Sequence, residues 1–166
     1  MTTDDEIIRR IRERARPGTL PPPASQEAAA QLEAAVGHRM PPLLRRIYLE
    51  VADGGFGRGN SALSLTEDRD EPPMLEAYLA WREGYGADYP TPVVPLLTWG
   101  CAIWSLVDFS TPEGQMWGWD PHGSCLRHSL FPEPLTLAQR LTGWLDDLEN
   151  FPAPLDETDC PDCMSC

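Results

Sequence analysis

The stretch that decides the fold covers residues 99–119 and reads WGCAIWSLVDF (99–109), STPEG (110–114) and QMWGW (115–119). Its first limb is rich in aromatic and β-branched residues, which suit a pleated, half-buried surface. Its middle contains Pro112 and Gly114, which favour a reversal of the chain. Side chains alternate along a strand, so Trp117 and Trp119 share one face of the second limb. We therefore predict a β-hairpin whose four tryptophans pack in the core of the sheet rather than form an aromatic ligand box.

Apolar residues recur at helical spacing on both sides of this hairpin, and capping residues mark several helix ends. Ser25 is a predicted N-cap, and Gly37 ends the helix that follows it. Thr136 and Gln139 have the spacing of a capping box ahead of the most clearly amphipathic helix, whose buried face is expected to include Leu148. The predicted helices cover residues 4–16, 25–36, 41–53, 74–83 and 136–148.

Short strands are predicted at residues 62–65, 93–97 and 125–130. Pro95 places the second of these strands at a sheet edge or a bulge, because proline has no N–H to donate to a neighbouring strand. Pro132 and Pro134 are expected to break the chain after the third strand.

A glycine cluster, DGGFG (53–57), follows the third predicted helix. Glycines can cradle phosphate, but this cluster follows a helix instead of leading from a strand into one, and it lacks the lysine of a P-loop. We interpret it as a structural turn in which glycine supplies positive φ angles.

The formal net charge is −13, from 26 acidic and 13 basic residues, and every base is an arginine. Such a surface repels nucleic-acid phosphates and attracts a basic partner, although acidic residues also serve solubility alone. One acidic group is a loop, and another lies at the end of the last helix, where negative charge opposes the helix dipole without an evident structural gain. Together they are the predicted partner-binding residues: Glu67, Asp68, Asp70, Glu71, Asp146, Asp147 and Glu149.

Five cysteines, an odd number, fit a reducing compartment better than a disulfide framework. Cys160, Cys163 and Cys166 could ligate zinc if Cys125, His122 or a second chain supplied a fourth ligand. They could also form a labile disulfide between Cys160 and Cys163, or be incidental to an acidic tail. We favour the last interpretation, so no cofactor is expected.

Catalysis is not expected either. A Cys125–His122 nucleophile pair would need an oxyanion hole and an orienting group, and the sequence indicates neither. His38 is assigned to a helix end or the surface, and His128 is predicted to pack against the sheet.

The N-terminus is acidic and lacks an apolar run, and no stretch approaches the roughly 20 apolar residues of a membrane helix. A cytoplasmic location without membrane contact is therefore expected.

The order of these signals resembles the SUKH superfamily, the Smi/Knr-like group that includes a fungal cell-wall assembly regulator and many bacterial toxin-immunity proteins. The resemblance depends on LPPPAS (20–25), on LE (32–33) in an alanine-rich helix, on MPPLL (40–44) and on the helix exit DGGFG (53–57). It implies an α+β domain, with a largely antiparallel sheet covered by helices. The domain would cover residues 1–151 and be followed by an acidic, cysteine-containing tail at 152–166, expected to be mobile.

Members of that family act by binding a protein and share no catalytic set. The resemblance therefore implies a non-catalytic domain, most simply an immunity protein that binds a cognate toxin and occludes it with an acidic surface. Two alternatives stay open. One is an intracellular scaffold or regulator without a toxin partner, and the other is a small zinc- or redox-responsive module built on the tail cysteines.

Overall fold

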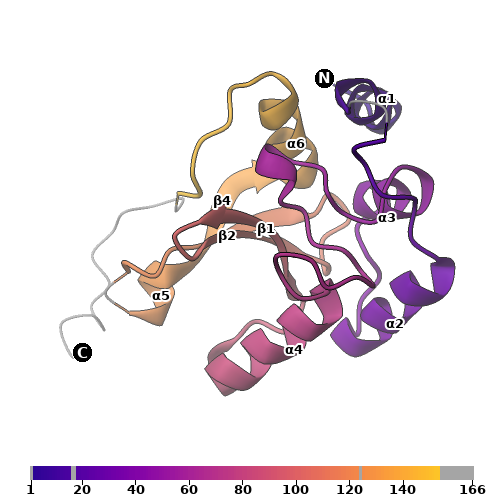
Figure 1. The fold of residues 1–166 in the computed structure, drawn as a ribbon. Helices are drawn as coiled ribbons and strands as arrows, with labels where there is room; N and C mark the ends of the chain where they lie inside the picture. The colour runs from indigo at the N-terminus through magenta and orange to yellow at the C-terminus, as the bar shows by residue number, and fades with distance from the viewer. Residues whose placement is uncertain (1, 16–17, 124, 154–166) are drawn as a thin grey trace.

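The computed structural model describes residues 2–15, 18–123 and 125–153, and these residues form helices and an antiparallel sheet (Figure 1). The α+β class is therefore confirmed. The helices are α1 (Asp4–Arg14), α2 (Gln26–Val36), α3 (Pro42–Glu50), η1 (Arg58–Asn60), α4 (Met74–Tyr85), η2 (Gly86–Asp88), α5 (Leu126–Ser129) and α6 (Leu137–Leu145). The strands are β1 (Val93–Gly100), β2 (Ile103–Asp108), β3 (Gln115–Trp119) and β4 (Leu130–Thr136).

The strands lie in the order β1-β2-β3-β4, each antiparallel to its neighbour. The predicted hairpin is formed by β2 and β3, in which Trp104 pairs with Trp119 and Val107 with Met116. β1 is an edge strand with a register shift just after Pro95, as its proline predicted.

The first predicted limb of the hairpin is divided between two strands. Trp99 and Gly100 end β1, and Cys101 and Ala102 form a two-residue turn into β2. Both turn residues have positive φ angles, 52° and 60°. That geometry matches the twist of a hairpin but normally requires Asn or Gly, so the residue types at 101 and 102 did not indicate this turn.

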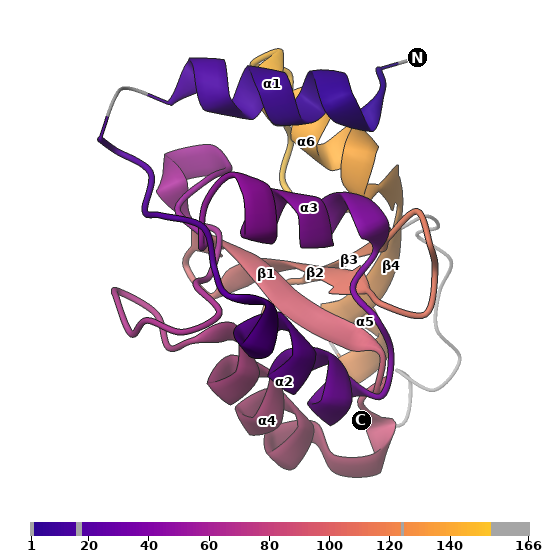
Figure 2. The ribbon, with the colours of Figure 1, turned by 90° about the vertical axis from the view of Figure 1, so that its right-hand side faces the viewer.

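Helices cover both faces of the sheet (Figure 2). In that view α1 and α3 lie above the sheet and α2 and α4 below it, and α6 packs against α1, α3, β3 and β4. Strand alternation sorts the side chains between the two layers. Val107 and Met116 are fully buried on the α6 side, and Leu106 is fully buried on the α4 side.

The hairpin tryptophans are not the centre of the core, contrary to our prediction. Trp104, Trp117 and Trp119 are half-buried on the α4 face, and Trp99 is half-buried on the other face, where its indole N–H donates to Ser105 Oγ at 2.8 Å. The fully buried positions are held mostly by Leu, Ile, Val and Met side chains from α1, α3 and the strands. The large rings stay partly exposed because α4 contacts the sheet mainly through β1 and leaves the β3–β4 half less covered.

Two predicted strands are wrong. Residues 62–65 form no strand and make a single β-bridge, from Ala62 to Leu97. Their backbone groups bond in two directions: Leu63 N–H donates to Leu96 O in β1, and Ala62 O accepts from Gly55 N–H in the glycine turn. Residues 126–129 form the short helix α5, so that the strand begins only at Leu130.

β4 then continues through Pro132 and Pro134, which were expected to break the chain. It tolerates them because it is the outer strand of the sheet, where a missing N–H costs no ladder bond on the open side.

The glycine turn is structural, as interpreted. Gly54 has a φ of +81°, and a Cβ there would lie 2.7 Å from the carbonyl oxygens of Ala62 and Leu63. Phe56 is buried and packs edge-on against Tyr48, with ring centroids 5.4 Å apart. The Tyr48 hydroxyl donates to Leu63 O at 2.6 Å, so this turn fixes α3 against residues 62–65.

The predicted helix starts at Ser25 and Thr136 are confirmed by side-chain caps, and the capping box with Gln139 is present. The end of α6 differs from the prediction. The helix stops at Leu145, Asp147 adopts a positive φ of 56°, and Leu148 N–H donates back to Gly143 O at 2.8 Å. This left-handed C-terminal turn leaves Leu148 74% exposed instead of on the buried face.

Residues 150–153, here called the C-terminal strap, lie across the α6 face of β3 and β4. Arg140 and Glu133 form a buried ion pair, with side chains 4% and 2% exposed, and Arg140 also donates to Asn150 O at 2.7 Å. Pro152 is buried over Gly118, where a Cβ would lie 2.6 Å from the proline ring. Burial raises the pKa of Glu133, and Arg140 opposes that shift.

Candidate functional site

Aromatic side chains of the α4 face, half-buried except for the buried Tyr89, gather around Trp81. Its ring centroid lies 5.4 Å from that of Trp119, 6.0 Å from Trp104, 5.7 Å from Tyr85 and 6.2 Å from Tyr89. Trp81 and Tyr85 lie about one turn apart on α4, so they share one side of the helix. The chain leaves the helix at Gly86, with a φ of 59°, and η2 then brings the Tyr89 ring 6.3 Å from that of Tyr85. The strand tryptophans meet them because Trp104 and Trp119 are directly paired across β2 and β3.

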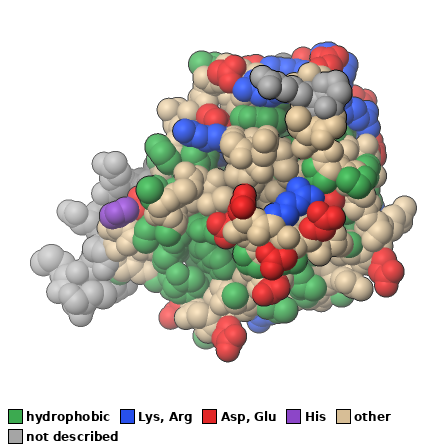
Figure 3. All heavy atoms as spheres, in the orientation of Figure 1, with side chains coloured by type: hydrophobic (Ala, Val, Ile, Leu, Met, Phe, Trp, Pro, Cys, Tyr) green, Lys and Arg blue, Asp and Glu red, His purple; other side chains and the backbone are tan. Residues whose placement is uncertain are grey.

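Next to this cluster lies a hollow of about 740 Å³. We call it the aromatic cleft. It lies between η2 and α5, on the α4 face of β3 and β4, and its walls are mostly apolar. The cleft is lined by Ala87, Asp88, Tyr89, Pro90, Trp117, Cys125, Leu126, Arg127, Leu130 and Pro132. Figure 3 shows hydrophobic side chains gathered at the lower left, between the positions of α5 and α4 in Figure 1.

Register explains why the cleft has this lining. Trp117 pairs with Pro132 and Trp119 with Leu130, so all four side chains point to the α4 face. Tyr89 closes the inner wall, and its hydroxyl donates to Val93 O at 2.5 Å. Burial raises the pKa of Tyr89 well above its ordinary value, so this hydroxyl stays protonated and serves as an anchor.

Few polar groups enter the cleft. Asp88 is exposed on the η2 side and Arg127 is exposed on the α5 side. Cys125 Sγ lies 3.3 Å from His128 Nδ1. Cys125 precedes α5, and His128 N–H donates to Cys125 O at 3.0 Å, so the first turn of the helix brings these two side chains together.

The Cys125–His122 pair that the sequence argument weighed and did not favour is not formed, because Cys125 contacts His128. His122 instead contacts Asp120, with Nδ1 2.8 Å and its backbone N–H 2.9 Å from Asp120 Oδ1. The hydrogen bond from that backbone N–H, followed by the one from the imidazole, lowers the pKa of Asp120. His128 belongs to α5 and not to a strand, so its predicted packing as a strand residue is wrong.

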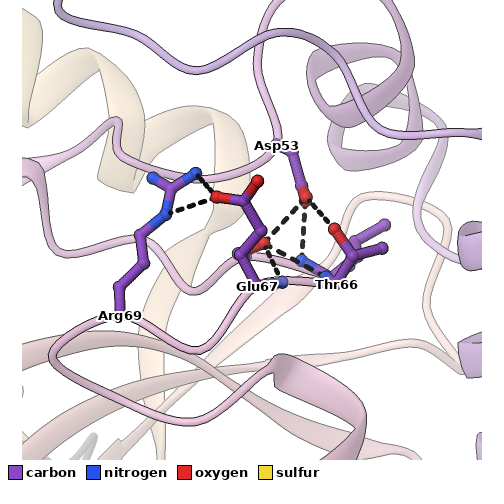
Figure 4. Close-up of polar contacts among 6 residues, drawn as sticks. Asp53, Thr66, Glu67 and Arg69 are labelled. Atoms are coloured by element: carbon purple, nitrogen blue, oxygen red, sulfur yellow. Dashed lines mark hydrogen bonds and ion pairs between the residues drawn. The ribbon is translucent and has the colours of Figure 1, made fainter.

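The first predicted acidic group forms a loop whose base is held by hydrogen bonds to Asp53 (Figure 4). Buried Asp53 accepts from Ser64 Oγ and Thr66 Oγ1, both at 2.7 Å, and from Leu65 N–H at 2.6 Å. Glu67 pairs with Arg69 at 2.8 Å. Glu67, Asp68 and Asp70 are exposed and Glu71 is half-buried, so the loop presents its charge outward and its partner-binding role stays a prediction.

The second predicted acidic group has a structural role that the sequence did not reveal. Asp146 pairs with Arg10 at 2.5 Å and Asp147 with Arg14 at 2.5 Å, so both carboxylates bind α1 to the end of α6. The hydrogen bond from Arg14 lowers the pKa of Asp147. These ion pairs supply the structural reason for acids at this helix end, which the sequence alone did not reveal.

Glu149 continues the same pattern, because it lies 3.9 Å from Arg58, and its side chain is only 18% exposed. The guanidinium of Arg58 in turn stacks on Trp99, 5.2 Å from the ring centroid. All three acids of the second group therefore face arginines, which reduces the charge that they offer a partner.

The tail residues Cys160, Cys163 and Cys166 lie outside the described residues, so zinc binding and a disulfide between Cys160 and Cys163 remain hypotheses. Within residues 2–15, 18–123 and 125–153, no group of three or more His, Cys, Asp or Glu side chains is placed to hold a metal ion.

Comparisons of the chain with protein-family models, curated proteins and solved structures find no match. Among the described helices, none combines the length and the apolar character needed to cross a membrane.

The aromatic cleft was missed by sequence reasoning, although signals for it were present. The four-residue spacing of Trp81 and Tyr85 marks an aromatic stripe on α4, and Trp117 and Trp119 mark a second one on β3. Only the pairing of α4 with the sheet reveals that the two stripes meet at a surface instead of in the core.

Proposed function

We propose that this chain is a non-catalytic protein-binding domain of the SUKH kind, and that it acts in the cytoplasm as an immunity protein for a cognate bacterial toxin. The observation that carries the proposal is the aromatic cleft. Tryptophan and tyrosine side chains that remain part-exposed beside a hollow are the groups that supply most of the binding energy in protein interfaces.

The acidic loop supports a protein partner with a basic surface. Glu67, Asp68, Asp70 and Glu71 lie on a loop anchored at Asp53, and the chain as a whole carries a net charge of −13. Such a field accelerates the approach of a basic partner and opposes nucleic acid. The loop then steers the encounter, and the cleft supplies the lasting contact.

The test begins with co-expression of each adjacent open reading frame in bacteria, with and without this chain. Rescue of growth by this chain identifies the toxin, and a purified complex then gives the affinity. If every neighbouring product is equally toxic, or equally harmless, with and without this chain, immunity is refuted.

The cleft is tested by Ala87→Arg, with Ala80→Arg as the matched control. Both alanines are exposed, but only Ala87 lines the cleft. A guanidinium placed inside a desolvated contact costs about 2 kcal/mol, which corresponds to about a 30-fold weaker complex. Equal affinities for the two variants would show that the partner binds elsewhere.

Neutralising the acidic loop with Glu67→Gln, Asp68→Asn, Asp70→Asn and Glu71→Gln tests the steering role. We expect a lower association rate and a weaker dependence of that rate on salt, with little change in the dissociation rate. A regulator without a toxin partner would instead bind a protein that is not encoded beside it, and the same two variant sets would map that contact.

A further inference from the structure

We infer that the C-terminal segment of this chain, residues 154–166, docks in the aromatic cleft and occupies it in competition with a protein partner. The inference does not depend on the nature of that partner. It rests on where the described chain ends, on the chemistry of the cleft and on the sequence of the segment that follows.

The starting point of this segment is fixed by the C-terminal strap. Arg140 holds Asn150 O, Pro152 is buried over Gly118, and the backbone N–H of Ala153 donates to the Glu133 carboxylate. Glu133 belongs to β4, the same strand whose residues Leu130 and Pro132 line the cleft. The segment therefore emerges at the free edge of the sheet, around which the cleft lies.

The required reach is short. From Glu133 back to Leu130 is three residues of strand, about 10 Å, and α5 adds about 6 Å. An extended chain covers about 3.3 Å per residue, so the seven residues from 154 to 160 can span about 23 Å. Cys160, and with a less extended chain Cys163, can thus reach Cys125 at the start of α5, and the other residues of the segment can cover the rest of the cleft.

The two surfaces are chemically complementary. The segment PLDETDCPDCMSC contains acids, no base, and apolar residues such as Leu155 and Met164. The cleft offers apolar walls, and its two exposed charged residues lie on opposite sides, Arg127 on α5 and Asp88 on η2, so the basic side is the one next to Cys125. In a chain with net charge −13, a basic group beside an apolar hollow is a favourable place for an acidic, partly apolar segment.

Sulfur chemistry makes the docked arrangement measurable. Docking brings a tail thiol next to Cys125, and oxidised glutathione can then join the two sulfurs. Two protein thiols and one oxidised glutathione give one protein disulfide and two reduced glutathione molecules, through a mixed disulfide that the second thiolate displaces. Cys101 is a built-in control, because it is exposed at the β1–β2 turn at the same end of the sheet.

The experiment uses the full chain carrying Cys160→Ser and Cys166→Ser, so that Cys163 is the remaining tail thiol. The reduced protein is treated with oxidised glutathione in native buffer and in concentrated urea, and the disulfides are mapped by peptide mass spectrometry. In urea, Cys163 is separated by 38 residues from Cys125 (163 − 125) and by 62 from Cys101 (163 − 101). Because the shorter loop closes more readily, the disulfide with Cys125 is favoured by about twofold. Docking is expected to raise that preference to at least tenfold in native buffer.

Arg127→Glu tests the charge contribution, with Arg39→Glu as the matched control on a distant exposed site. We expect the native formation of the Cys125–Cys163 disulfide to slow about threefold in the first variant and to stay unchanged in the second. Docking would be overturned if the preference of Cys163 for Cys125 over Cys101 in native buffer equalled the preference in urea. It would also be overturned if disulfides formed only between molecules. Stoichiometric zinc binding that protects the wild-type tail thiols from oxidation would overturn it in favour of a metal module.

Discussion

Replacing Gly118 by alanine tests how the C-terminal strap is seated. Gly118 is buried in β3, and a Cβ there would lie 2.5 Å from Phe131 Cε2, 2.6 Å from Pro152 Cβ and 2.8 Å from Phe131 Cζ. All three distances are shorter than real Cβ contacts, so the Phe131 ring or the strap must move. Overpacking of this kind costs about 1–3 kcal/mol, partly offset by up to about 1 kcal/mol gained from the lower chain entropy of alanine.

The expected net loss for Gly118→Ala is about 1–2 kcal/mol of unfolding free energy. With a urea m-value of about 2 kcal/mol/M, the unfolding midpoint falls by about 0.5–1 M. Gly143→Ala is the matched control, because that glycine lies inside α6 and its nearest neighbour to a Cβ is Glu149 Cα at 3.9 Å. It should raise the midpoint by about 0.3–0.5 M through helix propensity. Equal shifts in the same direction for both variants would refute this account of the strap.

Three further predictions concern single contacts. Arg14 lowers the pKa of Asp147, so the contribution of this pair to stability is present above the ordinary value of 3.8 and is lost as pH falls through the lower folded value. Because the pair is exposed, the protection of the α1 amides against hydrogen exchange should fall only modestly there in the wild type, and this fall should be absent in Asp147→Asn. Tyr89→Phe removes the hydrogen bond to Val93 O and should cost about 1–2 kcal/mol in urea unfolding. Thr136→Ala removes the capping box of α6 and should cost about 1 kcal/mol, and an unchanged melting temperature would contradict that role.

Local rules predicted the helices well because each signal acts within a few residues. Ser25 and Thr136 cap the helices that they were expected to cap, and the positive φ of Gly37 ends α2. The glycine turn was likewise recognisable, since a Cβ at Gly54 would meet two carbonyl oxygens.

Features that depend on distant partners could not be predicted in the same way. The turn at Cys101 and Ala102 has a conformation that its residue types disfavour, so only the pairing of β1 with β2 enforces it. The acids Asp146 and Asp147 appeared unfavourable on α6 alone, because the arginines that balance them lie about 130 residues away in the sequence, on α1.

The tryptophans illustrate the same limit for the candidate site. Strand alternation placed Trp117 and Trp119 on one face, correctly, but alternation does not say how far a helix covers that face. α4 contacts β1 more than β3, so Trp117 became a wall of the cleft and Trp119 stayed half-buried next to it, instead of both forming a core.

The prolines of the outer strands have a consequence for how this surface can change over evolutionary time. Pro95 in β1 and Pro132 and Pro134 in β4 deprive both margins of backbone donors, which discourages another chain from extending the sheet. Recognition that avoids the backbone must depend on exchangeable side chains. Such a molecule can acquire a new binding preference by a few substitutions around the cleft while its scaffold stays the same.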